Sequence, residues 1–199
     1  MAGGETVAWD EWQPRLFDSD LRPLISVYST LPGLPLDCFP NIIWRYEDPD
    51  SRDAFPGSIS LERHDCLHII LGRGLLNQDE AFVIGFTMGA ARNATFAHCL
   101  EFQHVASTLY TPPFQWSDSD LSAFRLAFHY AQTSSSVVRD LHLIPFELRM
   151  TESIHALRRL GGISVPDLKM LFECEKLLVT QSKASLRLPR EIETSDFRR

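Results

Sequence analysis

The sequence predicts a mostly α-helical, single-domain bundle of about six or seven helices. Apolar residues recur at helical spacing along most of the chain, capping residues precede these segments, and the alternation typical of strands is nearly absent. The length of 199 residues suits one domain, which we expect to cover residues 1–182. The apolar rhythm stops after Lys183, so residues 183–199 are expected to form a flexible tail.

The first expected elements are a short helix and a long proline-rich loop. Residues 18–30 have a capping aspartate or serine ahead of apolar residues at helical spacing, which favours a short helix. Prolines recur from Pro32 to Pro56 and predict a loop without a regular helix, in which IIWRY is one short extended piece. A loop of this length in a compact domain tends to be functional or to wrap the core.

The middle helices are predicted from their ends. A helix capped by Ser58 or Ser60 should run to about Leu71, and the glycines of the 72–76 turn should end it. A second helix should open at Asn77 and pass, almost fully buried, through FVIGFTMGAA. A continuation over roughly residues 95–110 should stop at the following proline pair.

Three further helices are expected downstream. Ser117 and Asp120 form a capping signature before LSAFRLAFHYAQ, and the TSSS run at 133–136 should break that helix. Pro145 suits the first turn of a helix that ends at a glycine pair. The apolar residues of that helix are Leu148, Ile154, Leu157 and Leu160. Pro166 should begin a last amphipathic helix, and these late helices could pair two chains in a homodimer.

Composition narrows the class of protein. A net charge of −7 argues against a nucleic-acid partner, which would require clustered lysine and arginine. The start of the chain does not resemble a secretory signal, and the longest apolar run, residues 81–91, is too short to span a bilayer. The four cysteines are scattered, which suits a reducing compartment. We therefore expect a cytoplasmic protein and leave peripheral contact with the inner membrane face open.

A cluster of metal-binding residue types lies before the glycine turn. His64 and His68 are four residues apart, and four residues advance a helix by about 6 Å and slightly more than one revolution, so both imidazoles face one side. Two nitrogens in this arrangement can bind one divalent ion, and Asp65 could ligate it or orient His64. Glu80 is the best further ligand, because the turn lets the second helix fold back beside the first.

An ordinary structural interpretation competes with the metal. Asn77-x-x-Glu80 is also a capping box, in which the Glu80 carboxylate would accept a hydrogen bond from the Asn77 amide. Asp79 suits the first turn of a helix because of the helix dipole. The residues alone leave both interpretations open.

These positions resemble a known motif. His64-Asp65-x-x-His68, eleven further residues and Glu80 resemble the H-D-x-x-H-x(11)-E motif of the coenzyme Q biosynthesis protein 4 family. The context, Leu-Gly soon after the second histidine and an apolar helix after the acid, is similar too. PFELRMTESIHALRRLGGI at 145–163 is a weaker similarity, so the resemblance covers roughly residues 55–163, the expected metal-site core. Family members commonly have glycine where this chain has Asp79, which adds a negative charge beside the site.

The resemblance implies a function and a ligand set. His64, Asp65, His68 and Glu80 would hold a divalent metal, with zinc expected and iron as the alternative. The protein would take part in ubiquinone biosynthesis, replacing the carboxyl group of a polyprenylated hydroxybenzoate-type precursor by a hydroxyl at ring carbon one. Its partners would be a prenylated aromatic lipid or isoprenoid and other quinone-biosynthesis proteins.

A prenyl chain requires an apolar groove, and the head group that carries it requires a cation. The helix after Glu80 and its continuation offer apolar candidates that are equally suited to the core, namely Phe82, Val83, Phe86, Met88 and Phe96. Three arginines could meet a carboxylate or phosphate, although most arginines are simply solvated: Arg63, Arg92 and Arg125. Five histidines show no shared ligand spacing and are expected at the surface or in the core: His98, His104, His129, His142 and His155.

Other functions are weighed against this one. A prenyl-lipid-binding scaffold would have the same fold and metal but no reaction. A His-Asp metal phosphohydrolase would require a histidine upstream of His64, and the sequence has none. A zinc peptidase of the H-E-x-x-H type would require glutamate, where this chain has Asp65.

Overall fold

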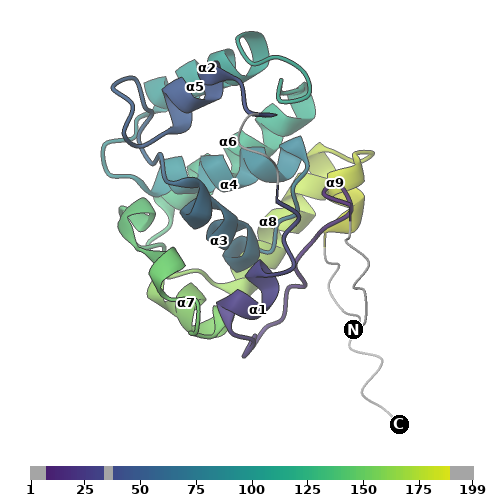
Figure 1. Ribbon diagram of the computed structural model, residues 1–199. Helices are drawn as coiled ribbons and strands as arrows, with labels where there is room; N and C mark the ends of the chain where they lie inside the picture. Colours follow the sequence, from purple (N-terminus) through teal and green to yellow (C-terminus); the bar gives the residue numbers. More distant parts are fainter. Residues whose placement is uncertain (1–7, 34–37, 189–199) are drawn as a thin grey trace.

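Helices account for all the regular structure in the part of the chain that the structure describes, residues 8–33 and 38–188 of a computed structural model (Figure 1). The α-helices are α1 (Leu24–Tyr28), α2 (Asn41–Glu47), α3 (Leu61–Leu71), α4 (Asn77–Ala90), α5 (Phe96–Thr108), α6 (Asp118–Thr133), α7 (Ile154–Leu160), α8 (Val165–Leu178) and α9 (Lys183–Arg187). Two short 3₁₀ helices, η2 (Leu141–Leu143) and η3 (Phe146–Leu148), lie between α6 and α7. The predicted mostly α fold is confirmed.

Helix α4 runs through the middle of the molecule and packs along α6 (Figure 1). Two glycines one helical turn apart, Gly85 and Gly89, let the backbones approach closely. A Cβ on Gly85 would lie 2.4 Å from the carbonyl oxygen of Phe124, and one on Gly89 would lie 2.2 Å from that of Phe128. The glycines of FVIGFTMGAA therefore set the distance between the two central helices.

We expect Gly89→Ala to destabilise the protein by about 2 kcal/mol. The added methyl group would meet backbone rather than a movable side chain, and this overpacking outweighs the roughly 1 kcal/mol that alanine gains in helix propensity. Chemical denaturation checks the change in the free energy of unfolding. Gly33→Ala is the control, because no described atom lies within 4 Å of the position its Cβ would take. Equal stability of the two variants would contradict the close-packing interpretation.

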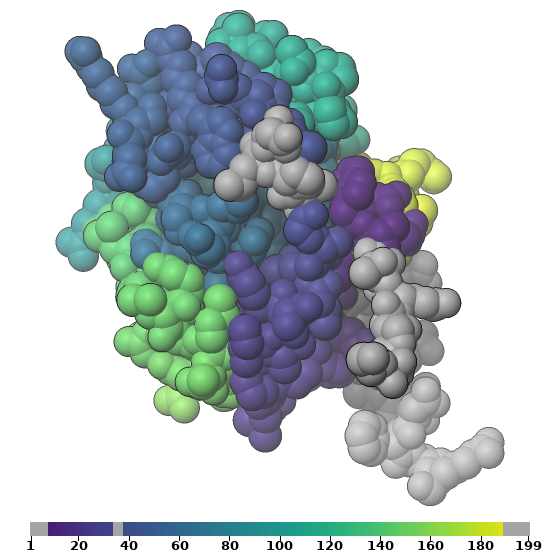
Figure 2. Space-filling view, viewed as in Figure 1, coloured from purple at the N-terminus to yellow at the C-terminus, as the bar shows by residue number. Residues whose placement is uncertain are grey.

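Apolar side chains form two clusters on either side of the central pair. The larger includes Leu67, Phe82 and Phe172 and joins α3, α4, α6 and α8. The smaller lies under α2 and α5, where the ring of Phe102 stacks on that of Phe124 with centroids 5.3 Å apart. The N-terminal segment and α7 lie side by side on one face (Figure 2), where the Leu24 amide donates to the Glu152 carbonyl at 2.9 Å.

Most predicted helix boundaries are confirmed. Helix α3 ends at Gly72, which adopts φ 72°, and α4 begins at Asn77. The Asp120 carboxylate accepts a hydrogen bond of 2.7 Å from the Ser117 amide at the start of α6. The predicted continuation of α4 is instead a separate helix, α5, whose first amides are capped by Thr95.

Three predictions need correction. The proline-rich segment contains α2, because Pro40 precedes its first residue and Pro49 comes two residues after its last, so neither interrupts it. The helix expected from Pro145 is split, since α7 begins only after Ser153, whose hydroxyl accepts from the Ala156 amide. Residues 183–188 are not a tail, because they include α9, in which Ser185 is buried; residues 189–199 lie outside the described part.

Candidate metal site

Helices α3 and α4 lie next to each other because the link between them is short. Gly72 turns the chain in the left-handed region, and the Arg73 amide donates to the His68 carbonyl at 2.8 Å to close the end of α3. Helix α4 starts five residues after Gly72 and places Glu80 in its first turns. The fold-back predicted from the sequence is therefore present, and it brings Glu80 to the histidine face of α3.

Three side chains converge at this point. The Glu80 carboxylate oxygen Oε2 lies 2.8 Å from Nε2 of His64 and 3.2 Å from Nε2 of His68, and the two Nε2 atoms are 2.9 Å apart. Around a tetrahedral ion with bonds near 2.1 Å, neighbouring ligand atoms would be about 3.4 Å apart. The three donors therefore need to separate by only a few tenths of an ångström, and His64, His68 and Glu80 could hold a metal ion.

A backbone carbonyl orients His68. Its Nδ1 lies 2.6 Å from the Gly74 oxygen, and because a carbonyl can only accept, Nδ1 carries the proton of the neutral ring. The lone pair of the neutral imidazole is then on Nε2, the atom that faces Glu80 and His64. Metal-binding histidines commonly donate their second N–H to a carbonyl in this way. His68 is completely buried, so this orientation is fixed by packing as well.

The structure decides between the two roles weighed for Glu80. Its carboxylate contacts the histidines, and the first turn of α4 is capped by Asp79, which accepts from the Leu76 amide at 3.2 Å. Asn77 donates its side-chain amide to the Pro113 carbonyl at 2.7 Å. The capping interaction thus belongs to Asp79, and Glu80 faces the site.

A buried ion cluster holds the turn that supplies the Gly74 carbonyl. The Arg73 guanidinium donates to both carboxylate oxygens of Glu175, at 2.8 and 2.9 Å, and its Nε lies 3.1 Å from Asp79. All three residues are at most 2% exposed. Arg73 is therefore shared between Asp79 and Glu175, and α8 is tied to the metal-site turn through Glu175.

The electrostatics favour a cation. Burial alone would raise the pKa of Glu80, but the adjacent His68 and His64 outweigh it and hold that pKa far below its usual value. Burial would lower the pKa of His64, but the hydrogen bond and charge of Glu80 outweigh it and raise that pKa. Without a metal, the site therefore favours a proton on His64, and a divalent ion would displace that proton on binding.

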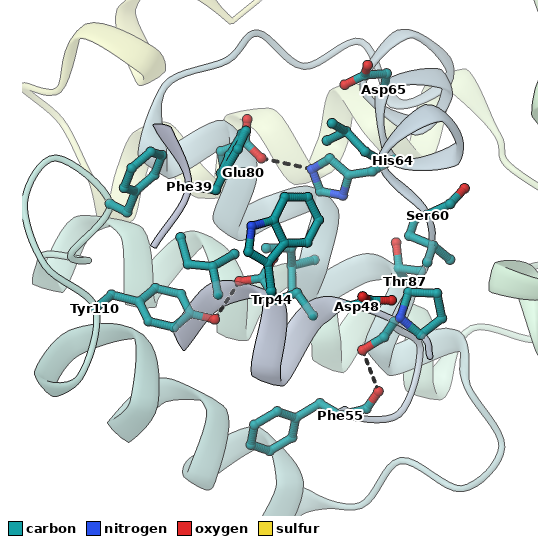
Figure 3. A pocket seen from close by; sticks show the side chains of 18 of the residues that line it. Phe39, Trp44, Asp48, Phe55, Ser60, His64, Asp65, Glu80, Thr87 and Tyr110 are labelled. Atoms are coloured by element: carbon teal, nitrogen blue, oxygen red, sulfur yellow. Dashed lines mark hydrogen bonds and ion pairs between the residues drawn. The ribbon is translucent and has the colours of Figure 1, made fainter. Parts of the chain in front are cut away.

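Asp65 is not among the three converging donors. It follows His64 on α3 and lines the same cavity as His64 and Glu80, and in Figure 3 its carboxylate lies apart from the bond between Glu80 and His64. Burial raises the pKa of this carboxyl group, although both neighbouring histidines act in the opposite direction. The described geometry thus joins three of the four predicted ligands, which leaves a coordination position for a substrate oxygen, water or a reoriented Asp65.

The donors open onto a large cavity of about 800 Å³. His64 and Glu80 form part of its wall, and most of the remainder is apolar, including Phe55, Met88 and Trp116. Much of this wall comes from the proline-rich segment, which the sequence predicted to be functional or to wrap the core. Cavities of this size are typical of small-molecule sites, and apolar walls suit an apolar ligand.

Two polar residues in this cavity were not predicted from the sequence. Glu47, the last residue of α2, accepts a hydrogen bond of 2.5 Å from the hydroxyl of Tyr110. A dashed line from the labelled Tyr110 marks this bond in Figure 3. Burial raises the pKa of Glu47 to about 7, despite the opposing effects of Tyr110 and His64. Glu47 can therefore gain or lose a proton near neutral pH in the same cavity as the metal donors, and the hydroxyl of Tyr110, whose pKa is raised by burial, serves as its hydrogen-bond donor. The sequence gives only a weak signal for this pair, because Glu47 is a single acid at the end of the stretch IIWRYE.

The raised pKa of Glu47 predicts a pH-dependent stability. Between its usual pKa of 4.5 and about 7 the folded protein retains a proton that the unfolded chain has lost, so stability falls as pH rises through this range. At 1.36 kcal/mol per pKa unit, the loss is up to about 3 kcal/mol. Glu47→Gln stays neutral and should show a flatter profile. Denaturation between pH 5 and 8 in the presence of a chelator measures the difference.

The control for this measurement is Glu101→Gln, which changes an exposed glutamate on α5. That variant should have the profile of the wild type. If Glu47→Gln and the wild type lose stability in parallel as the pH rises, Glu47 is not protonated in the folded protein.

The structure places most of the predicted apolar groove residues outside the cavity wall. Phe82, Val83 and Phe86 are completely buried in the larger core cluster, because their face of α4 packs on α8 and α6 rather than on α2. Phe96 is 54% exposed. Of the apolar candidates, the described cavity wall includes only Met88.

The arginines predicted to meet a head group have protein partners. Arg63 donates to both carboxylate oxygens of Glu147, at 2.7 and 3.0 Å, and so fastens α3 to the 145–163 segment. Arg92 is largely exposed and pairs with Asp140. Arg125 donates to the Gln103 side chain at 3.1 Å. The described cavity wall includes none of these arginines.

No helix in the described residues is both long enough and apolar enough to cross a membrane. Comparisons of the chain with protein-family models, with curated proteins and with solved structures gave no significant match.

Proposed function

We propose that this protein converts a polyprenylated hydroxybenzoate-type precursor of a quinone, with a divalent metal at His64, His68 and Glu80. The observation that carries the proposal is that His64 and Glu80 of this donor group form part of the wall of an apolar cavity of about 800 Å³. A ring carboxylate could reach the metal while its prenyl chain occupies the apolar space. The similarity of the motif to the coenzyme Q biosynthesis protein 4 family supports the same assignment.

The proposed reaction removes the ring carboxyl group as carbon dioxide and adds a hydroxyl at the same carbon. Dioxygen supplies the hydroxyl oxygen, and two electrons and two protons reduce its second atom to water. A bound divalent ion would polarise the substrate oxygens and stabilise charge developing on the ring. Zinc suits the donor set, and iron is the alternative because it can also engage dioxygen.

The chain's own residues have separable roles in this proposal. The apolar wall binds the prenyl chain and excludes water from the ring. The Glu47–Tyr110 pair provides a polar partner for a ring substituent and can hold or release a proton in the cavity. The Gly74 carbonyl keeps His68 in the tautomer that a metal requires.

The test is a turnover assay with purified protein loaded with zinc or iron. The substrate is a prenylated 4-hydroxybenzoate with an isotope-labelled carboxyl group, supplied with dioxygen and a reductant. We expect labelled carbon dioxide and the ring-hydroxylated product in the wild type, and neither in His64→Ala. Ile84→Trp, which fills the cavity from α4, should retain metal but lose substrate.

The outcomes separate the two functions. Binding of the substrate without turnover under either metal would favour a prenyl-lipid-binding scaffold, for which the apolar cavity is equally suited. Absence of both binding and turnover would overturn the proposal.

A further inference from the structure

A second cavity, of about 680 Å³, lies between α7 and the start of α8 and shares no lining residue with the cavity at the metal site. Its wall includes Arg158 and Arg159 of α7, Lys169 of α8 and Asp18. With His155 neutral, these groups give the wall a surplus of positive charge in a protein whose net charge is −7.

The carboxylates near this cavity do not neutralise Arg158. Asp18 lies 2.8 Å from Lys169 and is already bound to it. Asp20 influences Arg158 electrostatically, but its carboxylate accepts hydrogen bonds of 2.9 and 2.7 Å from the Arg22 guanidinium. The cavity therefore retains cations whose charge is not cancelled by direct contacts.

Arg158 is a buried residue of the cavity wall that has an unused hydrogen-bond donor. It is 2% exposed, and it donates from Nε to the Ile70 carbonyl at 2.8 Å and from Nη1 to the Phe17 carbonyl at 3.0 Å. Its Nη2 is buried and has no hydrogen-bond partner among residues 8–33 and 38–188. An unsatisfied buried donor on a charged group is costly, and burial lowers the pKa of Arg158 to about 10. Because Arg158 lines the cavity, an anion bound there would offer its guanidinium a hydrogen-bond acceptor and would raise its pKa again.

The start of α8 adds to this field. The helix has 14 residues, and Ser164, Val165 and Pro166 at its N-terminal end line the cavity. The partial positive charge of a helix N-terminus favours anions. Asp167, the acid of this first turn, accepts a hydrogen bond of 2.6 Å from Tyr130 and does not line the cavity.

We propose that this cavity binds a small phosphate-bearing anion, with the guanidinium groups of Arg158 and Arg159 as its cations and Lys169 as a further N–H donor that keeps its contact with Asp18. Arginine is suited to this role because its guanidinium donates in a fixed planar fork that matches phosphate oxygens. Ile70 belongs to the metal-site helix α3, so an anion held by Arg158 would also stiffen the support of that helix.

The experiment is calorimetric titration of the metal-loaded full chain with inorganic phosphate and, separately, with methyl phosphate. We expect one binding event in the wild type. The double variant Arg159→Gln/Lys169→Gln should weaken it by about tenfold or more, and Arg158→Met should do the same. A charge-matched control, Arg52→Gln/Arg92→Gln, changes two arginines remote from the cavity wall and should bind like the wild type.

The two anions separate the possible sources of the ligand. Binding of both identifies a phosphate site open to free phosphate, and binding of methyl phosphate alone identifies a site for a monoester. The double variant keeps the test valid if Arg158→Met does not fold. Equal binding in the cavity variants and the control would place the anion elsewhere, for example at the metal, and would overturn the proposal, as would absence of binding of either anion to the wild type.

Discussion

Replacing His68 with alanine is expected to abolish tight metal binding, while the wild type retains about one divalent ion per chain. His68 is completely buried, its Nδ1 is fixed by the Gly74 carbonyl, and its Nε2 lies 3.2 Å from the Glu80 carboxylate. Loss of an outer partner of a metal ligand typically costs 10–100-fold in affinity, so loss of the ligand itself should cost more than roughly 100-fold. Elemental analysis of the purified proteins, followed by competition with a chelator, measures this change.

Two further variants sharpen the metal experiment. His104→Ala changes an exposed histidine on α5 and should leave the metal content unchanged. Asp65→Asn distinguishes a three-ligand from a four-ligand site, and the described geometry predicts that it retains the ion. The affinity of the wild type should fall as the pH is lowered, because a proton on His64, favoured by Glu80, competes with the metal. Equal and negligible metal in the wild type and in His68→Ala would rule out the site.

Glu175→Ala should lower the free energy of unfolding by about 3 kcal/mol, because the buried Arg73 loses two hydrogen bonds and keeps only the contact with Asp79. The Glu175 carboxylate also accepts a hydrogen bond from Gln78, so a second buried donor loses its partner. Denaturation by urea measures the change. The matched control is Glu173→Ala on the same helix, an exposed residue paired with Lys176, which should change stability by no more than about 1 kcal/mol.

The Glu175 variant also tests the link between α8 and the metal. The turn that carries Gly74 is held by Arg73, so loosening Arg73 should reduce metal affinity even though no donor is changed. A folded Glu175→Ala protein with the stability and metal affinity of the wild type would show that the ion cluster is not needed.

Much of the fold could be predicted because its helix ends depend on local chemistry. Gly72 ends α3, and Ser117 with Asp120 starts α6, through interactions within a few residues. Helix α2 could not be predicted from the frequency of prolines in its segment. A proline prevents a helix only where it lies inside it, and here the prolines lie on either side of α2. Helix α9 was missed because five residues carry little pattern, and its formation depends on distant contacts such as Gln78 with Ser185.

The candidate site was predictable to the extent that it is local. His64, His68 and Glu80 could be predicted because one helix face and one short turn bring them together. Glu47 and Tyr110 lie 63 residues apart in the sequence, and no local pattern joins them. The face of α4 that would line the cavity was also beyond prediction, because this helix is apolar nearly all round and packs on both sides.

The contact between His68 and the Gly74 carbonyl has a consequence for how the chain becomes competent to bind a metal. All three donors lie within residues 64–80, so a fragment containing only α3 and α4 would possess every ligand atom. It would lack Glu175, which secures Arg73, and Trp12, whose carbonyl oxygen lies 2.9 Å from the place of a Cβ on Gly74. Local structure therefore brings the donors together, but sequence-distant parts of the chain hold the turn, so the fragment should bind a metal more weakly than the full chain.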